Sequence, residues 1–248
     1  MRLLTRDTNG ELVLHEFDND NLPAYAILSH TWNTDNSKEV SFQDLETGTA
    51  KAKAGYAKIL FCERQASVDG LRYFWVDTCC INKRNDPELS EAINSMFRWY
   101  NKSARCYVYL SDVSSSSNER NGLTMHTCES AFRQSRWFTR GWTLQELIAP
   151  NVVEFFTSEG RKLGDKSSLE MIIHEVTGIA EEALRGDHLS SFSTEMRMSW
   201  AAKRNTKREE DQVYSLLGVF DVSMPLVYGE GRERALKRLQ NEIDNNGM

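Results

Sequence analysis

The first 160 residues alternate between short apolar runs and stretches whose apolar residues recur at helical spacing. Each run is too short for a buried helix and is bounded by polar, turn-forming residues, so we expect a buried strand at each. The expected strands cover residues 25–28, 73–76, 106–110 and 152–156. Strands that alternate with helices in this way are typical of an α/β fold, with a parallel sheet and helices on its faces.

Three helical stretches in this part carry their apolar residues on one face. Residues 89–100 give the strongest pattern, and Asp86 is the expected cap of that helix. Residues 56–66 give a second stripe. A third helix over 142–148 is expected to stop before Pro150, because a proline disfavours helical geometry in the residue that precedes it.

Both ends of the chain depart from this alternation. Residues 2–4 and 11–14 flank a link that ends in an Asn-Gly pair, which predicts an N-terminal β-hairpin. After residue 160 only helical patterns remain, and the expected helices cover residues 169–176, 213–220 and 235–243. We therefore expect an α/β core over residues 1–160 and a helical C-terminal extension of the same domain over residues 161–248.

Composition and charge narrow the classes of partner. The 248 residues carry a net charge of -6, which gives no general attraction to nucleic acid or to anionic membranes. No apolar run approaches the roughly 18 residues of a membrane span, and no secretory signal opens the chain. The five cysteines are odd in number and lack metal-binding spacing. We expect a cytoplasmic protein that binds no metal, nucleic acid or membrane.

Polar and aromatic residues follow two of the expected strands, at the edge where ligands bind in open parallel sheets. Ser29, His30 and Trp32 follow the first strand, and Asp77 follows the second. Hydroxyl and imidazole groups form hydrogen bonds, and an indole offers a stacking face. This chemistry suits a nucleotide or a sugar.

The helix over 142–148 brings a carboxyl group to the same edge. Glu146 stands four residues after Trp142 and shares its face of the helix, and Arg140 comes just before them. A fixed carboxylate there can oppose a cation that develops during a reaction. The alternative is a solvated glutamate on the surface of an amphipathic helix, and the sequence leaves both interpretations open.

Other candidate sites have weaker support. Cys79 and His30 could form a Cys/His protease pair, but no family-specific motif surrounds either residue, and packing is the simpler interpretation for the cysteine. The glycine-rich loops of P-loop ATPases and of dinucleotide-binding dehydrogenases are absent from the sequence. The mixed charges over residues 204–211 are interpreted as the solvated start of a helix.

Three sequence blocks resemble the motifs of a known family. Residues 25–32 (YAILSHTW), 75–82 (WVDTCCIN) and 140–147 (RGWTLQEL) resemble, in order, the three motif blocks of the fungal heterokaryon incompatibility (HET) domain. Residues 204–214 and 226–231 resemble the C-terminal portion of that family. The resemblance implies a cell-death effector of fungal allorecognition. It also implies self-association and, in the full protein, the nucleotide-binding and WD-repeat modules of NLR-type incompatibility proteins.

A more distant likeness concerns mechanism. Residues 142–147 (WTLQEL) are similar to the Trp-Cys-x-x-Glu-Leu helix of TIR domains, whose glutamate cleaves the nicotinamide–ribose bond of NAD. The likeness implies a TIR-like, flavodoxin-like sheet, Glu146 as the catalytic residue, and NAD as a substrate with no separate cofactor. The implied substrate-binding residues are Ser29, His30, Trp32, Asp77, Arg140 and Trp142. Thr143 stands where TIR domains have the cysteine, and the helical C-terminal extension has no TIR counterpart.

Two further functions remain open beside an NAD glycohydrolase. One is a non-enzymatic death-signalling module that recruits partners through an exposed helix face. The other is a nucleotide or nucleic-acid hydrolase, which would need a metal or a more basic surface.

Overall fold

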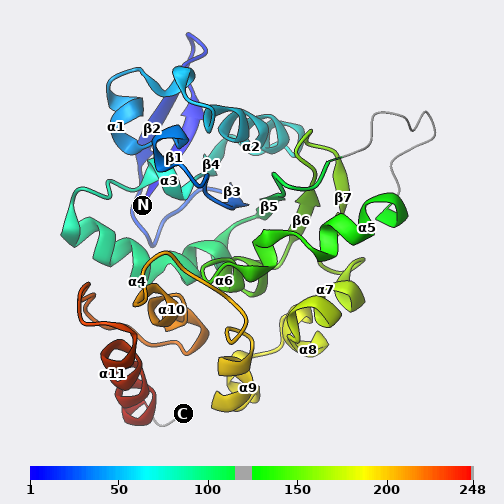
Figure 1. Ribbon diagram of the computed structural model, residues 1–248. Coiled ribbons are helices and arrows are strands. Elements are labelled where there is room, and N and C mark those ends of the chain that lie inside the picture. The colour runs from blue at the N-terminus through cyan, green and yellow to red at the C-terminus, as the bar shows by residue number, and fades with distance from the viewer. Residues whose placement is uncertain (115–124, 247–248) are drawn as a thin grey trace.

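A computed structural model describes residues 1–114 and 125–246, and within them the chain is organised around a seven-stranded sheet (Figure 1). The strands lie in the order β2-β1-β4-β3-β5-β6-β7. The central strands β4, β3, β5 and β6 pair in parallel, so the predicted parallel sheet is confirmed. The strands are β1 Arg2–Arg6, β2 Leu12–Glu16, β3 Tyr25–His30, β4 Tyr73–Trp75, β5 Arg105–Tyr109, β6 Val153–Phe156 and β7 Lys162–Asp165.

The parallel strands contain a point at which the order of the chain reverses. β4 pairs with one side of β3, and the chain then crosses back so that β5 pairs with the other side. The connections that leave β3 and β5 run in opposite directions, which opens a crevice beyond their carboxyl ends. This topology places the polar residues that follow β3 at the mouth of a crevice.

Both edges of the sheet are antiparallel, so the sheet as a whole is mixed. At one edge β1 and β2 form the predicted hairpin, and β1 also pairs with β4. At the other edge β7 pairs with β6, although only helices were predicted after residue 160. That prediction was wrong at β7 because Leu163 is the only large apolar residue in the strand, so its pattern gives no strand signal.

Helices cover both faces of the sheet (Figure 1). α2 (Tyr56–Val68) lies on one face, and α4 (Asp86–Lys102) and α6 (Thr143–Ile148) lie on the other. These are the three helices that the sequence predicted before residue 150. The cap of α4 is Asn85 rather than the expected Asp86, and its side chain accepts a hydrogen bond from the Glu88 N–H at 3.2 Å. The remaining helices before β6 are α1 Phe42–Glu46, α3 Asp77–Cys80, α5 Met125–Arg133 and the 3₁₀ turns Asn36–Lys38, Ala50–Ala52 and Arg136–Thr139.

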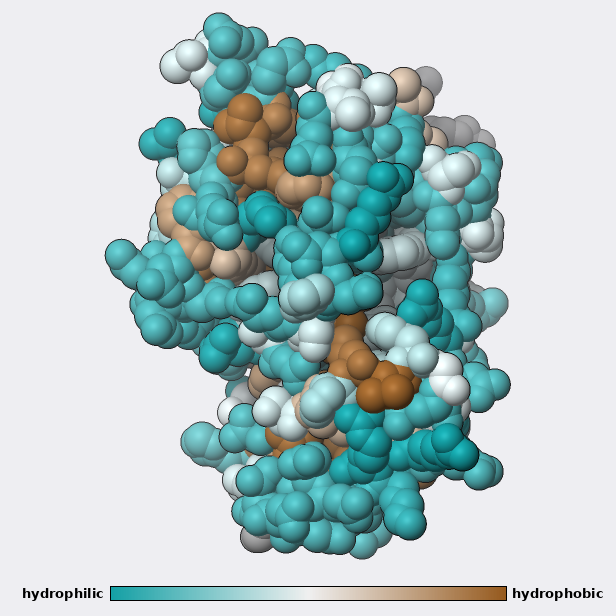
Figure 2. Space-filling model, turned by 90° about the vertical axis from the view of Figure 1, so that its left-hand side faces the viewer, coloured by the Kyte–Doolittle hydropathy of each residue, from teal (hydrophilic) through white to brown (hydrophobic). Residues whose placement is uncertain are grey.

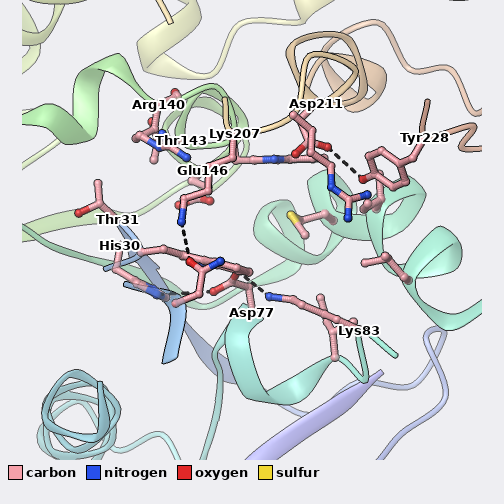
Figure 3. Close-up of a pocket in the computed structure, with 18 residues that line it drawn as sticks. His30, Thr31, Asp77, Lys83, Arg140, Thr143, Glu146, Lys207, Asp211 and Tyr228 are labelled. Carbon is pink, nitrogen blue, oxygen red and sulfur yellow. Dashed lines mark hydrogen bonds and ion pairs between the residues drawn. The ribbon is translucent and has the colours of Figure 1, made fainter. Parts of the chain in front are cut away.

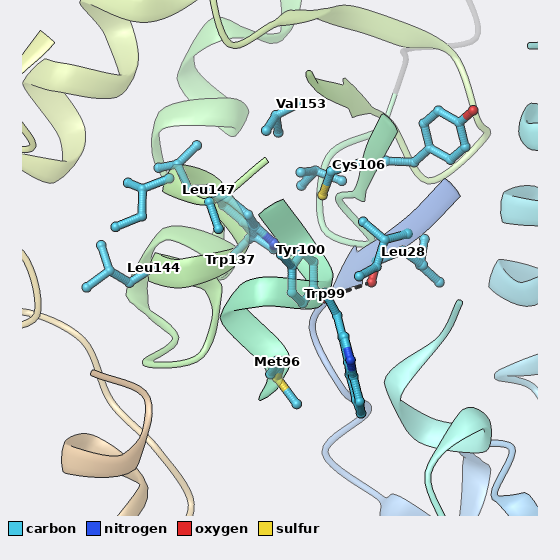
Figure 4. Packing of buried hydrophobic residues seen from close by; sticks show 14 of the residues in the cluster. Leu28, Met96, Trp99, Tyr100, Cys106, Trp137, Leu144, Leu147 and Val153 are labelled. Atoms are coloured by element: carbon cyan, nitrogen blue, oxygen red, sulfur yellow. Dashed lines mark hydrogen bonds between the residues drawn. The ribbon is translucent and has the colours of Figure 1, made fainter. Parts of the chain in front are cut away.

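The apolar core between the sheet and these helices holds the Leu144 and Leu147 side of α6 (Figure 4). Trp75 of β4 packs edge-on against Trp99 and Tyr100 of α4, with ring centroids 5.8 and 5.9 Å apart. Leu144 and Leu147 of α6 are fully buried, which contributes about 1.5–3 kcal/mol each. Every residue of α6 is buried, so this helix is a core element and not an amphipathic surface helix.

The C-terminal region, residues 166–246, packs beneath α4 and α6 (Figure 1). The helices predicted at 169–176 and 235–243 are confirmed, whereas the one predicted at 213–220 is interrupted after Tyr214. There the chain approaches α4 so closely that a Cβ on Gly218 would lie 2.0 Å from the Phe97 Cβ. The helices are α7 Glu170–Thr177, α8 Glu181–Arg185, α9 Thr194–Ser199, α10 Asp211–Tyr214, α11 Arg232–Asn245 and the 3₁₀ turns Leu189–Ser191 and Leu217–Val219.

Candidate functional site

A cavity of about 320 Å³ opens beyond the carboxyl ends of β3 and β4. Figure 3 shows residues of β3, of α3, of the segment around α6 and of the C-terminal region turned towards it. Six of the seven residues singled out in the sequence line this cavity: His30, Trp32, Asp77, Arg140, Trp142 and Glu146. The seventh, Ser29, lies behind the cavity wall and is completely buried.

The α6 wall of the cavity consists of Arg140, Trp142, Thr143 and Glu146. Glu146 is only 7% exposed, so the interpretation as a solvated surface glutamate is wrong. Burial raises the pKa of its carboxyl group to about 8, and the nearby Asp77 adds to this shift. The free protein therefore holds Glu146 mostly protonated at neutral pH.

Ser29 holds the Glu146 carboxyl group in place through a directed pair of hydrogen bonds. The Trp137 indole Nε1–H donates to Ser29 Oγ at 2.8 Å, and the Ser29 hydroxyl donates to Glu146 Oε2. An indole N–H can only donate, so the serine oxygen accepts from it and directs its own hydrogen to the carboxyl oxygen. This bond favours the ionised carboxylate and opposes part of the effect of burial. The position of Ser29 fits a positioning residue rather than one that touches a ligand.

Arg204 anchors the start of α6 from the C-terminal region. Its guanidinium is buried and donates to the Arg140 carbonyl at 3.0 Å and to Thr143 Oγ1 at 2.8 Å. Burial lowers its pKa to about 10, while the Glu146 carboxylate opposes that shift. Thr143, at the position where TIR domains have cysteine, thus has a defined role as a hydrogen-bond partner inside the fold.

The β3 wall of the cavity consists of His30, Trp32, Asp77 and Lys83. Trp32 Nε1 donates to Asp77 Oδ2 at 2.8 Å, and the Lys83 ammonium lies 3.4 Å from the same oxygen. Lys83 also lies over the Trp32 ring, 3.7 Å from its centroid. Burial opposes ionisation of Asp77, but Lys83 and its other partners outweigh this and hold the pKa below its usual range. One face of Trp32 is therefore already occupied by a cation.

His30, which belongs to this wall, has an imidazole nitrogen without a hydrogen-bond partner. Its Nε2 is buried, lies 3.7 Å from Asp77 Oδ1, and makes no hydrogen bond within the described structure. Burial lowers the pKa of His30 to about 4, with a further contribution from Lys58. His30 is therefore neutral at physiological pH, and its free nitrogen can donate a hydrogen bond to a ligand or accept one from it, depending on the tautomer.

The C-terminal wall of the cavity includes Lys207, Arg208, Asp211 and Tyr228, none of which was predicted from the sequence to be a site residue. The Tyr228 hydroxyl donates to Asp211 Oδ1 at 3.0 Å, and burial raises the pKa of Asp211. The charges over residues 204–211 were interpreted as a solvated helix start. The likeness of residues 204–214 and 226–231 to the HET family was a better signal for this wall. The first stretch contains Lys207, Arg208 and Asp211, and the second contains Tyr228.

The alternative protease pair does not form. Cys79 is fully buried in α3, does not line the cavity, and its thiol pKa is raised far above the usual range by a hydrogen bond with Cys80 and by burial. A thiol in that state is a poor nucleophile. Among the described residues, no group of three or more His, Cys, Asp or Glu side chains is placed to hold a metal ion. None of the described helices is both long and apolar enough to cross a membrane.

Comparison with known proteins agrees with the motif blocks. Residues 25–125 match the family model described as heterokaryon incompatibility protein (HET). The chain is also 57% identical, over 244 residues, to the vegetative incompatibility protein HET-E-1 of Podospora anserina. The resemblance to the HET family is confirmed. The match covers 98% of this chain but 18% of the relative, so the chain spans less than a fifth of that protein's length. No solved structure matches this chain, and the TIR-like fold stays a prediction.

Proposed function

We propose that this chain is the cell-death effector part of a fungal allorecognition protein, and that it cleaves NAD at the nicotinamide–ribose bond when copies assemble. The observation that carries the proposal is Glu146, a buried carboxyl group held by Ser29 on the wall of a cavity. The HET match and the relative named as a vegetative incompatibility protein support the allorecognition role. The strand order β4-β3-β5-β6 supports a TIR-like, flavodoxin-like core.

The proposed reaction places a cation next to this carboxyl group. The bond between C1′ of the ribose and the nicotinamide nitrogen breaks, and its electron pair leaves with nicotinamide. Water then adds to C1′ and releases a proton, which yields ADP-ribose. The C1′ centre becomes cationic in the transition state, as in glycoside hydrolysis, and a fixed carboxylate stabilises that charge. The nicotinamide ring of NAD is itself positive, so its arrival next to Glu146 lowers the carboxyl pKa and favours the charged form.

The cavity also suits one half of the substrate. Its volume of about 320 Å³ is near the lower end of the roughly 300–1,000 Å³ range of ligand pockets. That space accommodates a ribose with its nicotinamide ring, beside Glu146 and the partly exposed ring of Trp142. The remaining phosphates and the adenosine half then lie at the cavity mouth.

The test is release of nicotinamide from NAD by the chain fused to an inducible oligomerisation module. Assembly raises the effective concentration of neighbouring copies, and we expect turnover to rise when it is induced. Glu146→Gln keeps the shape and removes the charge, so turnover should fall at least about 100-fold, or about 2.7 kcal/mol. The control is Glu182→Gln, which neutralises an exposed glutamate on α8 and should leave turnover unchanged.

A non-enzymatic recruitment module is the outcome that would overturn this proposal. In that case folded Glu146→Gln protein would kill cells as the wild type does, without loss of NAD. The surface gives that alternative little support. The exposed large hydrophobic residues of the described chain are scattered singly over different elements, and Figure 2 shows one face that is mostly hydrophilic, with an upper and a lower hydrophobic group that hydrophilic residues separate. Recruitment surfaces are more often continuous apolar patches.

A further inference from the structure

The segment that carries Lys207 and Arg208 is fixed beside the α6 wall. The Gly141 N–H donates to the Asn205 carbonyl at 2.9 Å, and the Asn205 N–H donates to the Thr139 carbonyl at 2.7 Å. A Cβ on Gly141 would lie 2.4 Å from Thr206 Cγ2, so any other residue at 141 would have to displace the Thr206 side chain. The backbone at 205 and 206 is thus docked against the segment before α6, and the next two side chains reach the cavity mouth.

Three cationic residues line the cavity without an ion pair to a described carboxylate. Arg140, Lys207 and Arg208 form no ion pair with any described carboxylate within 4.0 Å. Lys207 Nζ donates to the neutral amide oxygen of Asn36, another residue that lines the cavity, at 2.5 Å. The Arg208 guanidinium lies over the Tyr228 ring, 4.1 Å from its centroid. These contacts hold two flexible cations at the cavity with neutral groups as their partners.

The neighbouring acids are engaged elsewhere. Asp77 binds Trp32 and Lys83 on the β3 wall. The Glu210 carboxylate accepts the backbone N–H groups of Gly229 and Gly231, at 2.8 and 3.1 Å. Glu146 and Asp211 are the acids on the α6 and C-terminal walls themselves; burial raises the pKa of both, and Asp211 accepts a hydrogen bond from the Tyr228 hydroxyl at 3.0 Å. Arg140, Lys207 and Arg208 outnumber these two acids, so the cations prevail in this part of the mouth.

We propose that Arg140, Lys207 and Arg208 form an anion subsite that binds a phosphate group of the ligand. Guanidinium and ammonium groups bind phosphate oxygens through charge-assisted hydrogen bonds, which are stronger than bonds to neutral acceptors. When the ligand binds, the Lys207 ammonium group leaves the amide oxygen of Asn36 and donates its hydrogen bond to a phosphate oxygen instead. The identity of the ligand rests on the proposed function. The subsite gives Lys207 and Arg208 of the C-terminal region the task of selecting a phosphorylated nucleotide over a neutral nucleoside.

The test compares AMP with adenosine by calorimetric titration of the whole chain. Wild-type protein should bind AMP at least about tenfold more tightly than adenosine, and added salt should narrow this difference. In the double variant Lys207→Gln, Arg208→Gln, AMP and adenosine should bind alike. Both side chains are exposed, so the variant should fold, and its melting curve verifies this. The matched control, Lys203→Gln with Lys237→Gln, removes the same charge from exposed positions outside the cavity and should keep the preference for AMP.

The outcomes separate this subsite from the proposed reaction. If the wild type binds AMP no better than adenosine, or the double variant keeps the preference, the subsite is overturned whether or not NAD is cleaved. If the preference disappears in the double variant only, the subsite holds even where no condition releases nicotinamide. Where NAD is cleaved, the double variant should also raise KM for NAD at least about tenfold with a smaller change in kcat. An unchanged KM would count against the subsite.

Discussion

The α6 wall and the C-terminal wall face the same cavity but are built in opposite ways. Glu146 and Thr143 are 7% and 2% exposed, and bonds from Ser29 and Arg204 fix their side chains. Lys207 and Arg208 are exposed, and their contacts are with a neutral amide and a ring. The first wall is organised before a ligand arrives, as stabilisation of a developing charge requires. The second can change partners, which suits capture of a charged ligand.

The largest expected effect tests the burial of the α6 wall. The folded pKa of Glu146, about 8, lies above its ordinary value of 4.5, so folding favours the protonated carboxyl group. The stability that this provides is complete below about pH 4.5 and is lost as the pH rises towards 8. Relative to Glu146→Gln, the wild type should lose up to about 1.4 kcal/mol of unfolding free energy for each pH unit in that window.

Urea unfolding of both proteins between about pH 5 and pH 8 measures this difference, and the other titrating groups largely cancel because both proteins share them. The double variant of Lys207 and Arg208 sharpens the comparison. Its stability should stay within about 0.5 kcal/mol of the wild type at every pH, since both residues are exposed. Parallel pH curves for wild type and Glu146→Gln would mean that the α6 wall is as open to water as the C-terminal wall.

The sequence predicted the buried α6 wall better than the exposed C-terminal wall. The parallel strands and α2, α4 and α6 were predictable because apolar runs and helical stripes record burial directly. Glu146 was singled out because tryptophans and arginines crowd around it in the sequence, and its catalytic role was implied by the likeness to the TIR helix. Lys207 and Arg208 were missed because a charge run beside a cavity has the same pattern as one in solvent. Only the chain's return to Gly141 places them at the site, and pairings over such a separation leave no local signal.

As with Lys207 and Arg208, the local sequence pattern was not enough to predict the role of Ser29. Its place after a strand predicted contact with a ligand, whereas the structure buries it between Trp137 and Glu146. The residue type was informative, since a hydroxyl can accept one hydrogen bond and donate another. The side of the sheet on which the Ser29 side chain lies could not be predicted. The last residues of β3 point alternately to the two sides, and only the register of the sheet decides which side chain reaches the cavity.

An intermediate effect is expected for Ser29→Ala, which removes the bond that favours the Glu146 carboxylate. Turnover of NAD should fall about tenfold, or about 1.4 kcal/mol. If the carboxylate is the active form, kcat/KM of the wild type should rise through about pH 8, and Ser29→Ala should move this rise to higher pH. The control is Ser103→Ala, which removes a buried hydroxyl bonded to the Tyr100 carbonyl at 2.7 Å. Loss of turnover with an unmoved pH profile would reduce Ser29 to a structural role.

The smallest expected effect concerns the β3 wall, which lies between the two extremes. Trp32 is partly buried, bonded to Asp77, and covered on one face by Lys83. Only its other face is open to a base or nicotinamide ring, so Trp32→Ala should weaken nucleotide binding by about 1 kcal/mol, the lower end of the range for a stacking aromatic. Trp32→Phe keeps a ring and should recover most of this affinity, although it loses the bond to Asp77. Titration of both variants with ADP-ribose measures the difference. Equal weakening in both would show that the indole N–H matters through Asp77, and that no ring stacks on Trp32.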